Sequence, residues 1–177
     1  MKKMTKLIAF LLLIGVYPMV SCTKTEDGTH VDPITLYEKV KGKWGLNEIL
    51  QIDETAKAGG ISPDEISLYG QFDFSSFSLT LNVDEQNLPT SYEVSGNAPE
   101  LFAKEGFWEL NSSFPSANGT APVIRLYADA EKKSLNGQLS IVSIPGAKAE
   151  MDLKLTRSAA GVPFVSYQYK LTNTNEE

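Results

Sequence analysis

The sequence predicts an all-β fold, an antiparallel up-and-down barrel of eight strands with a short N-terminal helix. Three observations predict it: about eight segments in which apolar and polar residues alternate, short connections between neighbouring segments, and only one segment with a helical period. A two-sheet β-sandwich is the alternative, because alternation does not show whether the first and last strands pair. The domain is predicted to cover residues 33–173.

The helix is predicted over residues 33–41. Asp32 is a capping residue, Pro33 suits the first helical position, and Gly42 ends the helix. Apolar side chains within this segment recur at helical spacing, which gives the short helix one face that can be buried.

The first strand is predicted over residues 42–52, where Trp44 and Ile49 supply apolar side chains. The alternation slips by one residue near Asn47, and a β-bulge would absorb this slip. A loop at 53–67 follows, rich in turn-forming residues and suited to cover a barrel mouth.

The clearest strand signal begins with Phe72 and Phe74 and continues with inward-facing Phe77, Leu79, Leu81 and Val83. A weaker strand is centred on Tyr92 and Val94. Later strands are predicted at 106–112, 123–128, 138–144, 150–157 and 164–172. Turns are predicted at the long segment 112–122, at Asn136-Gly137, at Pro145-Gly146 and at Gly161-Val162-Pro163.

A doubled motif gives these strands a family resemblance. Gly42-Lys43-Trp44-Gly45-Leu46 and Gly106-Phe107-Trp108-Glu109-Leu110 both read G-x-W-x-L. A G-x-W at the start of the first strand resembles the opening of the lipocalin fold. The doubled pattern looks like the small lipocalin-like lipoproteins of unknown function of gut bacteria (Bacteroidetes type), and the resemblance spans about Pro33 to Thr172.

The resemblance implies roles for four side chains. In lipocalins the tryptophan plugs the closed end of the barrel and a basic side chain near the end of the last strand covers it. Here Trp44 and Trp108 resemble the plug residues, and Arg157 and Lys170 are the candidate cations. All four roles are structural.

The first 21 residues read as a lipoprotein signal peptide. Residues 1–6 are positively charged, and the apolar run at 7–16 is too short to span a bilayer as a permanent helix. Ser21 before Cys22 resembles a bacterial lipobox, which implies a lipid on Cys22. The alternative is an ordinary cleaved signal with an incidental cysteine.

Residues 22–32 are predicted to be a lipidated flexible tether, because they are polar and lack a period. The cluster at 24–27 looks like the acidic export signal of surface lipoproteins, although it also reads as a solvated charge run. We therefore expect an outer-membrane lipoprotein, which faces the periplasm or is displayed on the cell surface.

Composition excludes several function classes. Removal of the three leader lysines leaves 13 basic and 22 acidic residues, a net charge of −9, which argues against nucleic acid as a partner. Cys22 and His30 are the only cysteine and histidine of the chain. The domain therefore lacks the usual nucleophile–base systems and zinc ligands, and we expect no enzyme activity, no metal and no cofactor.

The carboxylate pairs Asp64-Glu65 and Asp129-Glu131 are predicted to be solvated loop charges.

The inward faces leave two functions open. We expect a non-catalytic binder that holds a small apolar or amphipathic ligand in its barrel. The residues that would line this cavity are Phe77, Leu79, Leu81, Met151, Leu153, Tyr167 and Tyr169. The alternative is a filled barrel that acts through its outer surface on an envelope protein, as an accessory subunit or an enzyme inhibitor, with loops 53–67, 87–105 and 112–122 as contact surface.

Overall fold

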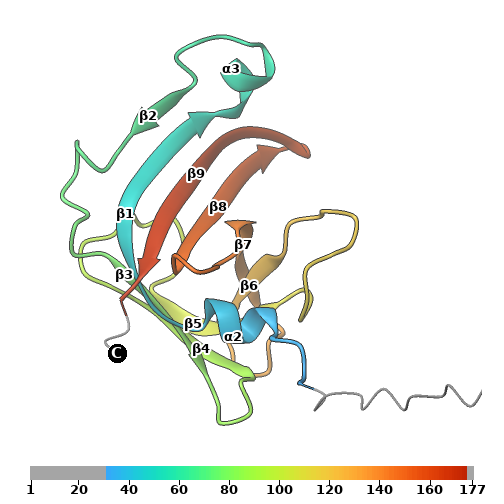
Figure 1. Ribbon diagram of the computed structural model, residues 1–177. Coiled ribbons are helices and arrows are strands. Elements are labelled where there is room, and N and C mark those ends of the chain that lie inside the picture. Colours follow the sequence, from blue (N-terminus) through green and yellow to red (C-terminus); the bar gives the residue numbers. More distant parts are fainter. Residues whose placement is uncertain (1–30, 175–177) are drawn as a thin grey trace, which may run out of the picture. The chain divides into compact units, whose positions relative to one another are not determined.

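The computed structural model describes residues 31–174, and its compact unit begins at Ile34 (Figure 1). The signal peptide and Cys22 lie outside the described residues. The elements of the described part are α2 (Leu36–Val40), β1 (Gly42–Asp53), α3 (Glu54–Ala58), β2 (Glu65–Ser67), β3 (Ser78–Val83), β4 (Pro89–Ser95), β5 (Glu105–Leu110), β6 (Val123–Tyr127), β7 (Leu135–Ser143), β8 (Glu150–Ala159) and β9 (Val162–Asn173).

Eight strands close into an antiparallel barrel. From β3 to β9 each strand pairs with its neighbour in the chain, and β1 pairs with both β3 and β9. The β1–β9 pairing runs from Trp44 to Asp53, so the first and last strands do meet. The predicted up-and-down barrel is therefore confirmed and the sandwich alternative is wrong.

The predicted slip in β1 is a β-bulge. The register of β1 against β9 shifts between Leu46 and Glu48, and Ile49 then pairs with Tyr169 on the core side. Without the shift, strict alternation from Trp44 would turn Glu48 inward. The bulge therefore keeps Ile49 in the core and places Glu48 on the outer face of the barrel.

One hydrophobic core lies inside the barrel. It holds 22 buried residues from α2, from the strands of the closed barrel and from the turn that precedes β3. The side chains of Trp44 and Trp108 have no exposed surface, and Tyr169 is 2% exposed. Interiors of this kind pack to the density of organic crystals, so the core supplies most of the stability of the fold.

The N-terminal helix α2 covers the end of the barrel at which β1 begins (Figure 1). Leu36 and Val40 are fully buried, and the Trp44 indole N–H donates to the Val40 carbonyl at 2.7 Å. Thr35 caps the helix in a capping box with Glu38. The predicted start at Asp32-Pro33 is therefore wrong by about one turn, because the capping box outweighs a proline at the first position.

A second short helix was not expected from the sequence. Within the predicted loop 53–67 the chain forms α3, and the Asp53 side chain accepts from the backbone N–H groups of Thr55 and Ala56. The same loop then forms β2, which pairs with β1 at Leu50–Ile52. Figure 1 shows α3 and β2 at the end of β1, at the opposite end of the barrel from α2.

Three local predictions differ from the structure. Phe72 and Phe74 lie in turns before β3 rather than in a strand. Asn136-Gly137 lies inside β7, because Asp129 accepts from the backbone of Lys133 and Ser134 and closes the β6–β7 turn earlier. The last hairpin turns at Ala160-Gly161, both with positive φ, so Val162-Pro163 already belongs to β9.

An ion pair fastens α3 to the outer face of the barrel. The Glu54 carboxylate lies 2.7 Å from the Lys154 ammonium and accepts a hydrogen bond from Ser166, which is fully buried. Two hydrogen bonds lower the pKa of Glu54, and the one from Lys154 has a larger effect than the one from Ser166.

No helix among residues 31–174 is both long and apolar enough to cross a membrane.

We expect Glu54→Gln to lower the free energy of unfolding by about 1 kcal/mol at neutral pH, because it removes one charge-assisted contact. Since the pKa of Glu54 is lowered by folding, this contribution is present above the unfolded value of about 4.3 and is lost as the pH falls through the folded value. Urea unfolding of both proteins across this range measures it. Glu131→Gln, at an exposed position of the β6–β7 turn, is the control and should not differ from wild type. A difference between Glu54→Gln and wild type that persists at the acid end contradicts the assignment.

Candidate functional site

The residues predicted to line a ligand cavity lie in the hydrophobic core. Six of the seven are buried and Tyr167 is partly buried. The Tyr169 ring lies 5.9 Å from the ring of Phe77 and 6.0 Å from that of Phe102. Five hollows of 310 to 510 Å³ among residues 31–174 are lined by residues other than these seven.

The two tryptophans lie at the end of the barrel that α2 covers. The Trp108 indole N–H donates to the Asn82 carbonyl at 2.8 Å, and its ring lies 5.7 Å from that of Tyr37 in α2. The Tyr37 hydroxyl in turn reaches the backbone of Leu110. Helix and tryptophans thus form one buried cluster.

The two cations that the resemblance assigned to the tryptophans have other partners. The Lys170 ammonium bonds to Glu48 at 2.6 Å on the outer face of β9. The Arg157 guanidinium donates to the Leu101 carbonyl, and Arg157 pairs with Val165 at the opposite end of the barrel from Trp44. The expectation that a cation lies over an indole is therefore wrong. Backbone carbonyl groups accept hydrogen bonds from both indole N–H groups, and the Tyr37 ring packs against the Trp108 ring.

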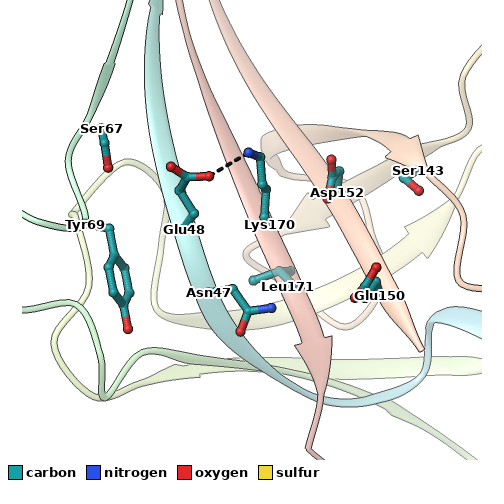
Figure 2. Close-up of a pocket in the computed structure, with 9 residues that line it drawn as sticks. All are labelled: Asn47, Glu48, Ser67, Tyr69, Ser143, Glu150, Asp152, Lys170 and Leu171. Carbon is teal, nitrogen blue, oxygen red and sulfur yellow. Dashed lines mark hydrogen bonds and ion pairs between the residues drawn. The ribbon is translucent and has the colours of Figure 1, made fainter. Parts of the chain in front are cut away.

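A polar hollow of about 510 Å³ crosses the outer face of β1, β9 and β8 (Figure 2). We call it the acidic hollow, and its lining residues are Asn47, Glu48, Ser67, Tyr69, Ser143, Glu150, Asp152, Lys170 and Leu171. Strand register explains how the hollow forms, because Glu48 pairs with Lys170, Lys170 with Asp152, and Asp152 with Ser143. Figure 2 shows Ser67 and Tyr69 on one side of this row and Ser143 on the other.

Carboxylates outnumber cations in the acidic hollow. Glu48, Glu150 and Asp152 face a single cation, Lys170, among the lining residues. The hydrogen bond from Lys170 to Glu48 raises the pKa of Lys170, and the charges of Asp152 and Glu65 raise it further. Lys170 therefore stays protonated at neutral pH, whereas a lysine nucleophile needs a lowered pKa. The Asp152 carboxylate also accepts from the Gln168 amide at 3.0 Å.

Carboxylate side chains are also potential metal ligands. Residues 31–174 contain no group of three histidine, cysteine, aspartate or glutamate side chains arranged to hold a metal ion. Asp129, predicted to be a solvated loop charge, closes the β6–β7 turn, and backbone hydrogen bonds lower its pKa. The acidic hollow presents a net negative surface with hydrogen-bonding groups. Such a surface is suited to bind a basic group.

Sequence reasoning did not find this hollow. Glu48 reaches the outer face only because of the bulge, and its contact with Lys170 joins residues 122 positions apart. The sequence did carry a signal for the hollow. The slip near Asn47 predicts which residues of the first strand point outward, and polar residues occupy the outward positions of the alternating strands.

A family model described as "Domain of unknown function (DUF5004)" matches residues 20–172. No curated protein and no solved structure matches the chain.

Proposed function

We propose that the folded domain is a non-catalytic interaction module that binds a partner protein through its outer surface. The chain belongs to DUF5004, a family of domains of unknown function. The observation that carries this proposal is the apolar packing of side chains in the barrel interior. The seven side chains that would line a ligand cavity pack in the core, while the largest hollow described above lies on the outside. The acidic hollow is the surface that we assign to the partner.

The anchor is part of the proposal. A lipid on Cys22 would hold the module at a bacterial outer membrane, facing the periplasm or the cell surface. The family match begins at residue 20 and so includes Cys22. The closed barrel with a short helix at one end supports the likeness to lipocalin-like lipoproteins.

Lack of catalysis is also part of the proposal. Its support is the direction in which charged groups are shifted: the pKa of Lys170 is raised and that of Glu54 is lowered, so each is held in its charged form. General acids and bases need the opposite, a pKa moved towards neutrality.

The proposal is tested on the full chain expressed in its host and extracted in detergent. We expect chemical cross-linking to yield a heteromeric complex, and mass spectrometry to find an N-terminus at acylated Cys22. Asp152→Lys should abolish the complex, because it places a cation opposite Lys170 and reverses a charge of the hollow.

Glu131→Lys makes the same change of charge at an exposed position of the β6–β7 turn, and it should leave the complex intact. A complex that survives Asp152→Lys, or that both variants abolish equally, contradicts the assignment of the hollow. A monomer in every extract contradicts the interaction module itself.

One observation favours a second candidate function, the binding of an amphipathic ligand inside the barrel. The buried hydroxyls of Tyr92 and Tyr169 have no hydrogen-bond partner, and burial raises the pKa of Tyr169, so its phenol stays a donor. An unpaired buried hydroxyl costs about 1–3 kcal/mol. An amphipathic ligand with an acceptor group, admitted by rearrangement of the core, would relieve that cost at Tyr169.

A further inference from the structure

The free edge of β2 is a candidate binding site for a protein segment. We propose that an extended, basic segment of a partner protein docks along Glu65–Ser67 and adds a strand to the sheet next to β2. This inference rests on the proposed function, because it names where a partner protein binds and which chemistry it presents.

Backbone geometry defines the edge. Asp53 N–H donates to the Asp64 carbonyl at 2.7 Å, and Leu68 N–H donates to the Ile49 carbonyl at 2.9 Å. Hydrogen-bonding residues alternate along an antiparallel strand, so Ile66 also directs its backbone groups to β1. The backbone groups of Glu65 and Ser67 therefore point away from β1.

No described strand covers that side of β2. The sheet order of residues 31–174 begins with β2, and β1 to β9 close the barrel without it. The β3 partner of β1 pairs only with Gly42–Gly45, which leaves β2 as an extension of the sheet beside the barrel. An open row of backbone donors and acceptors is a template for a further strand.

The two faces of β2 differ, and each adjoins a hollow. Glu65 and Ser67 pair with Ile52 and Leu50, which places them on the outer face, where Ser67 also lines the acidic hollow. Ile66 faces the other way, is 47% exposed and lines a separate hollow of about 310 Å³ together with Gln51, Asp53 and Asp64. A docked strand would thus direct alternate side chains to the outer face of Glu65 and Ser67 and to the face that carries the exposed Ile66 side chain.

Charge decides the kind of partner. Asp64 and Glu65 flank the edge, and Glu48 lies in the neighbouring hollow. A second copy of this chain would bring further carboxylates to an edge that is already acidic, and like charges repel each other. A segment that alternates lysine or arginine with apolar residues matches the carboxylates beside the edge on one face and the exposed Ile66 side chain on the other.

A synthetic probe tests this on the full chain in detergent. The probe is a capped peptide of alternating lysine and valine, and the control peptide alternates glutamate and valine. We expect binding of the lysine peptide alone, with slowed amide hydrogen exchange at Glu65 and Ser67, measured by NMR. Glu65→Lys should weaken binding by about tenfold or more, since like charges would then meet.

Two variants separate strand addition from simple charge attraction. Ser67→Pro removes an edge N–H but no bond to β1, so it should abolish the protection at Glu65. Glu131→Lys, at an exposed position of the β6–β7 turn, should bind as wild type does. No binding up to about 1 mM, equal binding of the glutamate peptide, or protection at other amides overturns the edge site.

The experiments distinguish a failure of the β2 edge site from a failure of the proposed function. A partner complex that cross-links through the acidic hollow while the peptide fails refutes the β2 edge alone. A monomer in every extract refutes the interaction module, whatever the peptide does.

Discussion

Replacing Trp108 by alanine is expected to lower the free energy of unfolding by about 3–5 kcal/mol, the usual cost of removing a fully buried tryptophan. The side chain has no exposed surface, donates to the Asn82 carbonyl and packs against Tyr37. Truncation would therefore open a cavity beside α2 and leave the Asn82 carbonyl without this donor. Urea unfolding, followed by tyrosine fluorescence and circular dichroism, measures the change.

Two variants make the Trp108 result interpretable. Trp108→Phe keeps most of the ring contact and loses only the N–H, so it should cost less than alanine does. Phe114→Ala, at a 43% exposed aromatic in the long 112–122 turn, should cost under about 1 kcal/mol. A loss below about 1 kcal/mol for Trp108→Ala would mean that the helix–tryptophan cluster does not hold this end of the barrel.

The second large effect is expected at Gly106, the glycine of the second G-x-W. A Cβ at this position would lie 2.3 Å from the Tyr127 carbonyl oxygen and 2.9 Å from Cε1 of Tyr92, and φ is +156°. We expect Gly106→Ala to lower the free energy of unfolding by about 3 kcal/mol, from overpacking and backbone strain together.

The control for Gly106 is Gly70→Ala, because a Cβ at Gly70 has no atom within 4 Å. Thermal and urea unfolding of the two variants should differ clearly in midpoint. If Gly106→Ala is as stable as Gly70→Ala, the close approach of Tyr92 and Tyr127 to Gly106 is not a real constraint.

The G-x-W pattern carried information that the sequence alone did not explain. Both of its glycines have positive φ, +104° at Gly42 and +156° at Gly106, and both tryptophans are buried and contact α2. The pattern therefore marks two places where a strand begins beside a large indole. Alternation likewise found β3, β8 and β9, since one face of each is buried.

Two other features depend on contacts that the strand and turn patterns did not reveal. The α3 helix is five residues long and is fixed by Lys154 and Ser166, far along the chain. Asn136-Gly137 has strong turn chemistry, but Asp129 closes the turn first and the pair is drawn into β7. In the first case distant contacts decide the structure, and in the second a competing local turn at Asp129 outweighs the Asn-Gly propensity.

The sequence also left open whether the barrel is hollow or filled. The same inward residues satisfy either case, because alternation reports which face is buried and not how far side chains reach across. In the structure the rings of Phe77, Phe102 and Tyr169 come within contact distance inside the barrel. The acidic hollow was hidden for a different reason, since it depends on the bulge that turns Glu48 outward.

The most direct test of the central claim is native mass spectrometry of the full chain, purified in mild detergent from its own host. A filled barrel predicts a mass that corresponds to the polypeptide, its lipid and a partner protein, with no small molecule retained once the partner is removed. A small molecule bound at unit stoichiometry, and lost in the Tyr169→Phe variant, would contradict the account and establish the barrel interior as the binding site.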